Sequence, residues 1–156
     1  MLKFQFLIIC MFSINSTLVL AKECFETTTG VTFCRDYTNP KLGESWRDPF
    51  GLVWGESMGG GGYDNAVNFY DAVEYCREKG GRLPSRDDFV ILQKLFGGKE
   101  YQPQIFKHFT RSYWTSTDAS EVFHNRYIFN ADAGVFYRRL VTSENLAKVM
   151  CVMQVD

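Results

Sequence analysis

The sequence predicts an α+β domain in which two helices pack on a mainly antiparallel sheet. Two amphipathic segments with helical spacing of apolar residues fall in the middle of the chain. Segments of strand type come before them and fill the last third, where aromatic and β-branched residues alternate with polar ones. Strand-rich ends around a helical middle are typical of α+β folds.

The composition is that of one folded domain. The chain has 156 residues, of which 46% are hydrophobic and 22% are charged. The net charge of -1 excludes a disordered chain and gives no basic excess for binding nucleic acid. Only the N-terminus carries a long apolar run, which excludes a protein with several membrane spans.

Residues 1–21 predict a secretory signal peptide. Lys3 precedes an apolar core over 4–12, and small residues end at Ala21, where we expect cleavage. A membrane anchor is the alternative, but four polar residues between positions 13 and 17 interrupt the apolar run. We therefore expect an exported protein without a membrane span, in the periplasm, outside the cell or on its surface.

The cysteines agree with export. Cys10 leaves with the signal peptide, and four remain: Cys24, Cys34, Cys76 and Cys151. An even number in an exported chain favours two disulfides, with three possible connectivities. A zinc site is the alternative, but the sequence has no Cys-x-x-Cys pair, and its two histidines, His108 and His124, lack a ligand-like spacing.

The first strands form a predicted hairpin over residues 24–37. Thr and Phe residues suit its two arms, and Gly30 lies between them. This hairpin would bring Cys24 beside Cys34. A linker and a turn then lead to a short strand over 52–54.

Two helices follow. The first is expected over 64–79, where apolar residues recur at helical spacing before Gly80 ends it. Ser85 begins the second, with Asp88 at the position of a capping box. Its inner face is formed by Phe89, Leu92, Leu95 and Phe96.

The last third predicts a strand over 113–117 and a hairpin with arms 122–130 and 134–141. A final strand over 147–155 has apolar residues on both faces, which is typical of a central strand covered on both sides. A disulfide from Cys76 in the first helix to Cys151 in this strand would close a long loop and stabilise the fold by about 4 kcal/mol.

Five short segments occur in a characteristic order along residues 46–153. They are DPFGLVW at 48–54, DAVEYC at 71–76, GRLPSRDDF at 81–89, YWTST at 113–117 and VMCV at 149–152. Together they resemble the Lcl C-terminal domain family, a bacterial exported group with a C-type lectin-like fold. The resemblance implies such a fold for residues 46–156, preceded by a hairpin and linker over 22–45. It also implies the pairs Cys24–Cys34 and Cys76–Cys151.

The resemblance implies a ligand-binding function more than a catalytic one. The namesake domain of the family binds sulfated glycosaminoglycans, whereas most members have no assigned activity, and a shared fold does not transfer a ligand. The motifs of calcium-dependent lectins, Glu-Pro-Asn, Gln-Pro-Asp and Trp-Asn-Asp, do not occur. Possible oxygen ligands are scattered in expected turns, at Asp118, Glu121, Asn130 and Asp132. We therefore expect neither the usual calcium site nor another metal or cofactor.

Candidate ligand-binding residues lie in the last third. Alternation places Tyr127 and Phe129 on a core face and Arg126 on the opposite face. Arg126, Arg138 and Arg139, with Arg111, would form a cationic patch that holds sulfate or carboxylate groups. Scattered solubilising arginines are the alternative. Trp114 is a candidate stacking platform for a sugar, with a place in the core as its alternative.

The hypothesis is therefore a non-catalytic module that binds a glycan or a protein surface. A structural subunit of an envelope assembly is one alternative. An enzyme is the other, because Arg82-Leu83-Pro84-Ser85 resembles a segment of the formylglycine-generating enzymes. Those enzymes use a reactive cysteine pair, whereas Cys151 is the one late cysteine here. The two histidines, which fall in an expected loop and an expected strand, are weak candidates for the base of a serine hydrolase.

Overall fold

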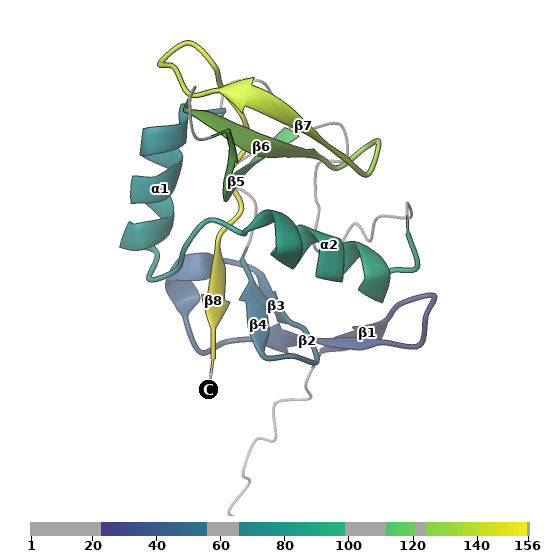
Figure 1. Ribbon diagram of the computed structural model, residues 1–156. Helices are drawn as coiled ribbons and strands as arrows, with labels where there is room; N and C mark the ends of the chain where they lie inside the picture. The colour runs from purple at the N-terminus through teal and green to yellow at the C-terminus, as the bar shows by residue number, and fades with distance from the viewer. Residues whose placement is uncertain (1–22, 56–65, 99–111, 121–123, 156) are drawn as a thin grey trace, which may run out of the picture.

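A computed structural model describes residues 23–55, 66–98, 112–120 and 124–155. These residues form an α+β structure with two helices and two antiparallel sheets, as the sequence predicts for the fold class (Figure 1). The strands divide into a five-stranded and a three-stranded sheet instead of one sheet. The predicted signal peptide lies outside the described residues. No helix in the described parts of the chain has the length and apolar character to cross a bilayer.

The five-stranded sheet has the order β1-β2-β3-β4-β8. Its strands are β1 (Cys24–Glu26), β2 (Thr32–Asp36), β3 (Ser45–Arg47), β4 (Leu52–Trp54) and β8 (Val152–Gln154). The predicted hairpin is present, with Cys24 opposite Cys34 and a disulfide between them. Because β2 pairs with β3, this hairpin is continuous with the rest of the sheet. The boundary expected between residues 45 and 46 falls within β3.

Helix α1 (Phe69–Glu78) is shorter than the predicted 64–79. Asn68 caps it, accepting a hydrogen bond from Asp71 N at 3.0 Å. Val67 is extended because it pairs with Ala147, which explains the late start. The predicted capping box of α2 (Arg86–Leu95) is confirmed: Asp88 N donates to Ser85 Oγ at 3.0 Å, and Ser85 N donates to Asp88 Oδ2 at 2.6 Å.

The three-stranded sheet lies between the two helices. It consists of β5 (Ser112–Ser120), β6 (Asn125–Asn130) and β7 (Val135–Leu140), which confirms the predicted late hairpin. On one face, Phe69 of α1 packs edge-on against Trp114, with ring centroids 5.6 Å apart. On the other, Phe89 of α2 stacks on Phe129 at 4.4 Å. Both faces of this sheet therefore contribute to the core.

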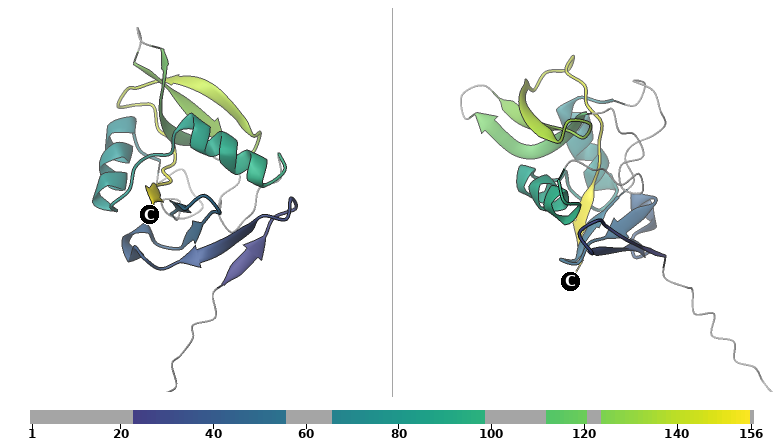
Figure 2. Two further views of the ribbon diagram at one scale, coloured as in Figure 1. Left: turned by 60° about the horizontal axis from the view of Figure 1, so that its bottom comes forward. Right: turned by 90° about the vertical axis from the view of Figure 1, so that its right-hand side faces the viewer.

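The prediction of a central strand over 147–155 is wrong. Only β8 is regular, and it lies at the edge of the five-stranded sheet. Residues 147–151 are buried and run from the three-stranded to the five-stranded sheet, shown in yellow in Figure 2. Their partners change along the way: Ala147 pairs with Val67, and Lys148 N donates to Ser112 O. This buried linking segment, residues 147–151, ends at the confirmed disulfide between Cys76 and Cys151.

Candidate functional site

The three predicted ligand-binding arginines do not lie on one face. In the register of β6 and β7, Arg126 is opposite Arg139, and Tyr127 is opposite Arg138. Cross-strand partners share a face, and consecutive residues alternate between faces. Arg126 and Arg139 therefore lie on the face toward α1, and Arg138 lies on the face toward α2.

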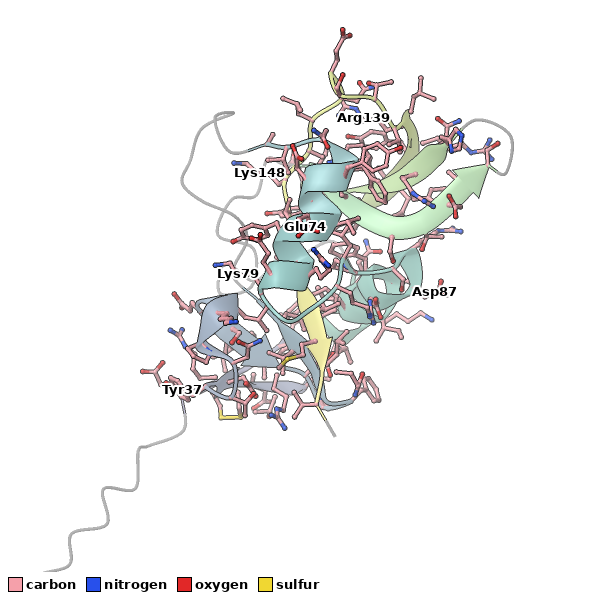
Figure 3. All side chains as sticks on the ribbon, turned by 90° about the vertical axis from the view of Figure 1, so that its left-hand side faces the viewer. Tyr37, Glu74, Lys79, Asp87, Arg139 and Lys148 are labelled. Carbon is pink, nitrogen blue, oxygen red and sulfur yellow. A yellow bond between two sulfur atoms is a disulfide. The ribbon has the colours of Figure 1, made fainter. Side chains whose placement is uncertain are left out.

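On the face toward α1, the protein itself engages both arginines. The Arg126 guanidinium lies 4.7 Å from the centroid of the Phe69 ring and forms an ion pair with Asp118. Burial lowers the pKa of Arg126. Arg139 donates to Asn145 Oδ1 at 3.4 Å and lies at the end of the molecule remote from Tyr37 (Figure 3). The guanidinium groups of Arg126 and Arg139 are therefore largely engaged by other residues of the protein and are poor candidates for binding a ligand.

Trp114 belongs to the core. Its side chain is completely buried, and its Nε1 donates to Val67 O at 2.8 Å. Ile128, its cross-strand partner, is also completely buried. The alternative that the sequence offered for this residue, a place in the core, is where the structure puts it, so its ring offers no exposed face to a sugar.

A different cluster occupies the face toward α2. Arg138 is exposed and lies opposite Tyr127. The Arg86 guanidinium, from the start of α2, lies 4.9 Å from the centroid of the Tyr127 ring and 5.5 Å from that of Phe136. Within the described parts of the chain, no carboxylate forms an ion pair with Arg86 or Arg138. Arg86, Tyr127 and Arg138 are called the arginine–tyrosine cluster below.

The position of Arg86 explains why it points at these rings. It directly follows the cap Ser85, and its backbone N donates to Thr117 Oγ1 at 2.9 Å, which ties α2 to β5. The N-terminus of a helix carries partial positive charge, which disfavours a cation there. Stacking on aromatic faces compensates for this repulsion. An arginine at the first helical position was a signal in the sequence, but Arg86 was not among the predicted site residues.

A second feature is a small pocket of about 120 Å³. Its lining consists of Asp48, Phe50, Leu52, Asp88, Ile91 and Gln154. Both carboxylates are engaged: Asp48 accepts from Trp54 Nε1 at 3.1 Å, and Asp88 from Arg82 at 2.6 Å. Burial acts to raise the pKa of Asp88, but hydrogen bonds from Arg82 and Ser85 outweigh it, and the net shift is downward. These carboxylates serve the fold.

The oxygen atoms considered for calcium do not converge in the described residues. Asp118 pairs with Arg126, and Asn130 Oδ1 accepts from Ala133 N at 2.9 Å. Asp132 is exposed in the turn between β6 and β7, and Glu121 lies outside the described residues. No group of three or more His, Cys, Asp or Glu side chains that could hold a metal occurs in the part of the chain that the structure describes.

Cys151 is bonded to Cys76 and is 2% exposed. It therefore does not offer the free thiol that the enzyme hypothesis needs. No family model matches the chain, and no curated protein sequence matches it. The arginine–tyrosine cluster is therefore the feature of this protein that most clearly indicates a function.

Proposed function

We propose that this protein is an exported, non-catalytic binding module with the C-type lectin-like fold of the Lcl C-terminal domain family. Its ligand is an anionic group on a glycan or a protein surface, bound without the usual calcium site. The observation that carries the proposal is the arginine–tyrosine cluster. Two helices, two antiparallel sheets and a disulfide from α1 to the segment before β8 support the fold.

The cluster has the chemistry of an anion site. A guanidinium binds sulfate or carboxylate through two parallel, charge-assisted hydrogen bonds. Arg86 is already ordered by its contacts with Tyr127 and Phe136, so less side-chain entropy is lost when a ligand binds. Arg138 is exposed and adds a second cation beside the same tyrosine ring. Both arginines remain available to a ligand.

The test is a glycan array probed with the oxidised protein, including sulfated polysaccharides, in calcium and in chelator. We expect binding that persists in chelator and weakens as salt rises, because the contacts are ionic. Arg86→Gln and Arg138→Gln should each weaken binding about tenfold. Lys41→Gln is the matched control, because Lys41 is an exposed cation beside the five-stranded sheet.

Loss of binding in chelator would contradict a site without calcium. Equal affinity of Arg138→Gln and Lys41→Gln would remove the arginine–tyrosine cluster from the proposal. A reproducible turnover activity that one substitution abolishes would overturn the non-catalytic assignment and favour the enzyme hypothesis.

A further inference from the structure

Strand β7 lies at an edge of the three-stranded sheet, and no other described strand pairs with its outer side. Val141 N donates to His124 O at 3.0 Å, which shows that the backbone groups of Val141 point toward β6. In an antiparallel ladder the direction alternates at each residue, so Phe136, Arg138 and Leu140 point their N–H and C=O groups outward. Leu140 O accepts from Asn145 Nδ2 at 3.1 Å on that outer side, in agreement with this direction. In Figure 1, β7 is the outermost strand of its sheet.

The other sheet edges are shorter or occupied. The outer edge of β5 bonds to the linking segment, because Trp114 N donates to Lys148 O at 3.1 Å. Val152 of β8 exchanges two hydrogen bonds with Arg82. Strand β1 has only three residues and carries a disulfide at Cys24. Among the described strands, β7 therefore presents the most accessible pairing edge, with both backbone groups of Phe136 and Arg138 directed outward.

The positive charge of β7 determines which kind of strand can pair with its outer edge. Strand β7 contributes Arg138 on one face and Arg139 on the other, and it contains no acidic residue. Arg139 also lies directly opposite Arg126, and like charges in that position are unfavourable. A second copy of β7 would add two more arginines beside these, whereas carboxylates would complement them. The edge therefore favours an acidic strand over self-association.

We propose that the outer edge of β7 accepts an extended acidic segment of another protein as a fourth, antiparallel strand of the sheet. This inference rests on the proposed function and names its ligand class as polypeptide. Main-chain hydrogen bonds to Phe136 and Arg138 supply affinity, and the side chains opposite β7 supply specificity. Two consecutive carboxylates face Arg139 and Arg138, and two β-branched residues then face Tyr137 and Phe136.

The arginine–tyrosine cluster takes part in this recognition. The residue opposite Arg138 in the added strand projects to the face toward α2, where Arg86 and Tyr127 also lie. One carboxylate at that position can therefore accept hydrogen bonds from two guanidinium groups. The neighbouring carboxylate projects to the opposite face, beside Arg139.

The probe is the fluorescently labelled peptide acetyl-Thr-Glu-Glu-Val-Thr-Val-amide, measured by anisotropy. Two derivatives separate strand addition from charge. N-methylation of the second Glu and second Thr removes the N–H groups that face Arg138 O and Phe136 O, and it should weaken binding about tenfold or more. N-methylation of the first Glu and first Val leaves charge and methyl count unchanged, but these N–H groups face away from β7. That derivative should bind nearly as well as the parent.

Amide exchange by NMR gives the second readout. The amides of Phe136 and Arg138 should exchange freely in the protein alone and become protected at least about tenfold with the peptide, because each gains a hydrogen bond. The amide of Tyr137 points toward β6 and should change little. Arg138→Glu should weaken binding about tenfold, and a peptide with Lys at the second Glu should restore it. Lys41→Glu is the control for net charge.

The outcomes distinguish this inference from the proposed function. If dextran sulfate binds through Arg86 and Arg138 but both N-methylated peptides bind alike, strand addition is wrong and the anion site stands. If neither dextran sulfate nor the peptide binds, both proposals are wrong. Sedimentation tests the remaining alternative. If the chain self-associates and Arg138→Glu changes this self-association, a second copy of the chain occupies the edge and the acidic partner is wrong.

Discussion

The charged side chains at the five-stranded sheet and at the three-stranded sheet differ in whether they have polar partners inside the protein. In the five-stranded sheet, buried Asp36 is held by Thr38 and Arg47, and buried Asp48 accepts hydrogen bonds from two backbone N–H groups and an indole. At the arginine–tyrosine cluster, cations lie against aromatic rings and no described carboxylate pairs with them. Charges that are paired inside the protein stabilise the fold, whereas cations without an ionic partner among the described residues are the ones we expect to bind a ligand.

The largest expected effect comes from the disulfide that joins α1 to the linking segment. Replacing Cys76 and Cys151 by Ser should lower the free energy of unfolding by about 4 kcal/mol, because the bridge closes a loop of 75 residues. Replacing Cys24 and Cys34 by Ser should cost about 3 kcal/mol, because that loop spans 10 residues. Urea denaturation of the two double variants measures both values. Equal losses would contradict the dependence on loop length.

Asp48 tests whether the buried, hydrogen-bonded carboxylates beside the five-stranded sheet stabilise the fold. Asp48→Ala removes the acceptor of Phe50 N, Leu52 N and Trp54 Nε1, and it should destabilise the protein by about 3 kcal/mol. Asp87→Ala is the control. Asp87 is exposed in the first turn of α2, where its loss should cost less than about 1 kcal/mol. Similar losses of stability for both variants would show that the buried carboxylate of Asp48 contributes no more to stability than the exposed carboxylate of Asp87.

Low pH should reduce the stability that the buried carboxylate of Asp36, in β2 of the five-stranded sheet, contributes to the protein. Burial acts to raise the pKa of Asp36, but hydrogen bonds from Thr38 and Arg47 outweigh it and hold the pKa of the folded carboxyl below its ordinary value. The stability that Asp36 contributes is therefore present above the pKa of the unfolded state and is lost as pH falls through the folded pKa. Asp36→Asn should lose about 2 kcal/mol at pH 7. Its stability should also fall less steeply than that of the wild type between about pH 5 and pH 2, measured by urea denaturation across that range.

The smallest effects on stability are expected at the arginine–tyrosine cluster. Arg138→Gln should change the free energy of unfolding by less than about 0.5 kcal/mol, because Arg138 is exposed and lacks an ionic partner among the described residues. Arg86→Gln should cost about 1 kcal/mol through lost ring contacts. Thermal melts of both variants, compared with Lys41→Gln, measure this. A loss of 3 kcal/mol or more at Arg138, on the scale of a buried core substitution, would assign this residue to the fold.

Local signals in the sequence predicted most of the secondary structure. The capping box at Ser85 and Asp88, the hairpin at Cys24 and Cys34 and the late hairpin each depend on residues close together in the chain. The start of α1 was misplaced because Val67 pairs with Ala147, a contact across 80 residues that periodicity does not reveal. The last strand was overextended because apolar residues on both faces look the same in a regular strand and in a buried link.

The candidate site shows a different limit. Arg138 and Arg139 are neighbours in one strand, so their side chains lie on opposite faces, a consequence of alternation that the prediction of one cationic patch did not take into account. The role of Arg86 depended on packing, because only the fold brings the start of α2 beside Tyr127. The sequence predicted that Arg126 lies on the face opposite the core face, but Phe69 of α1 packs against it there, and the pattern of residues in β6 does not reveal this helix.

The disulfide between Cys76 and Cys151 imposes an order on how the molecule is made. A chain that emerges N-terminus first presents Cys76 while Cys151 is still 75 residues behind. Cys24 can pair with Cys34 at once, whereas Cys76 must wait as a thiol that is able to attack the earlier bridge. Because Cys151 ends the buried linking segment between the two sheets, the second bridge fixes α1 to the segment that joins them. The bond from Cys76 to Cys151 is therefore the later of the two bridges, and a reactive thiol at Cys76 identifies a chain in which it has not yet formed.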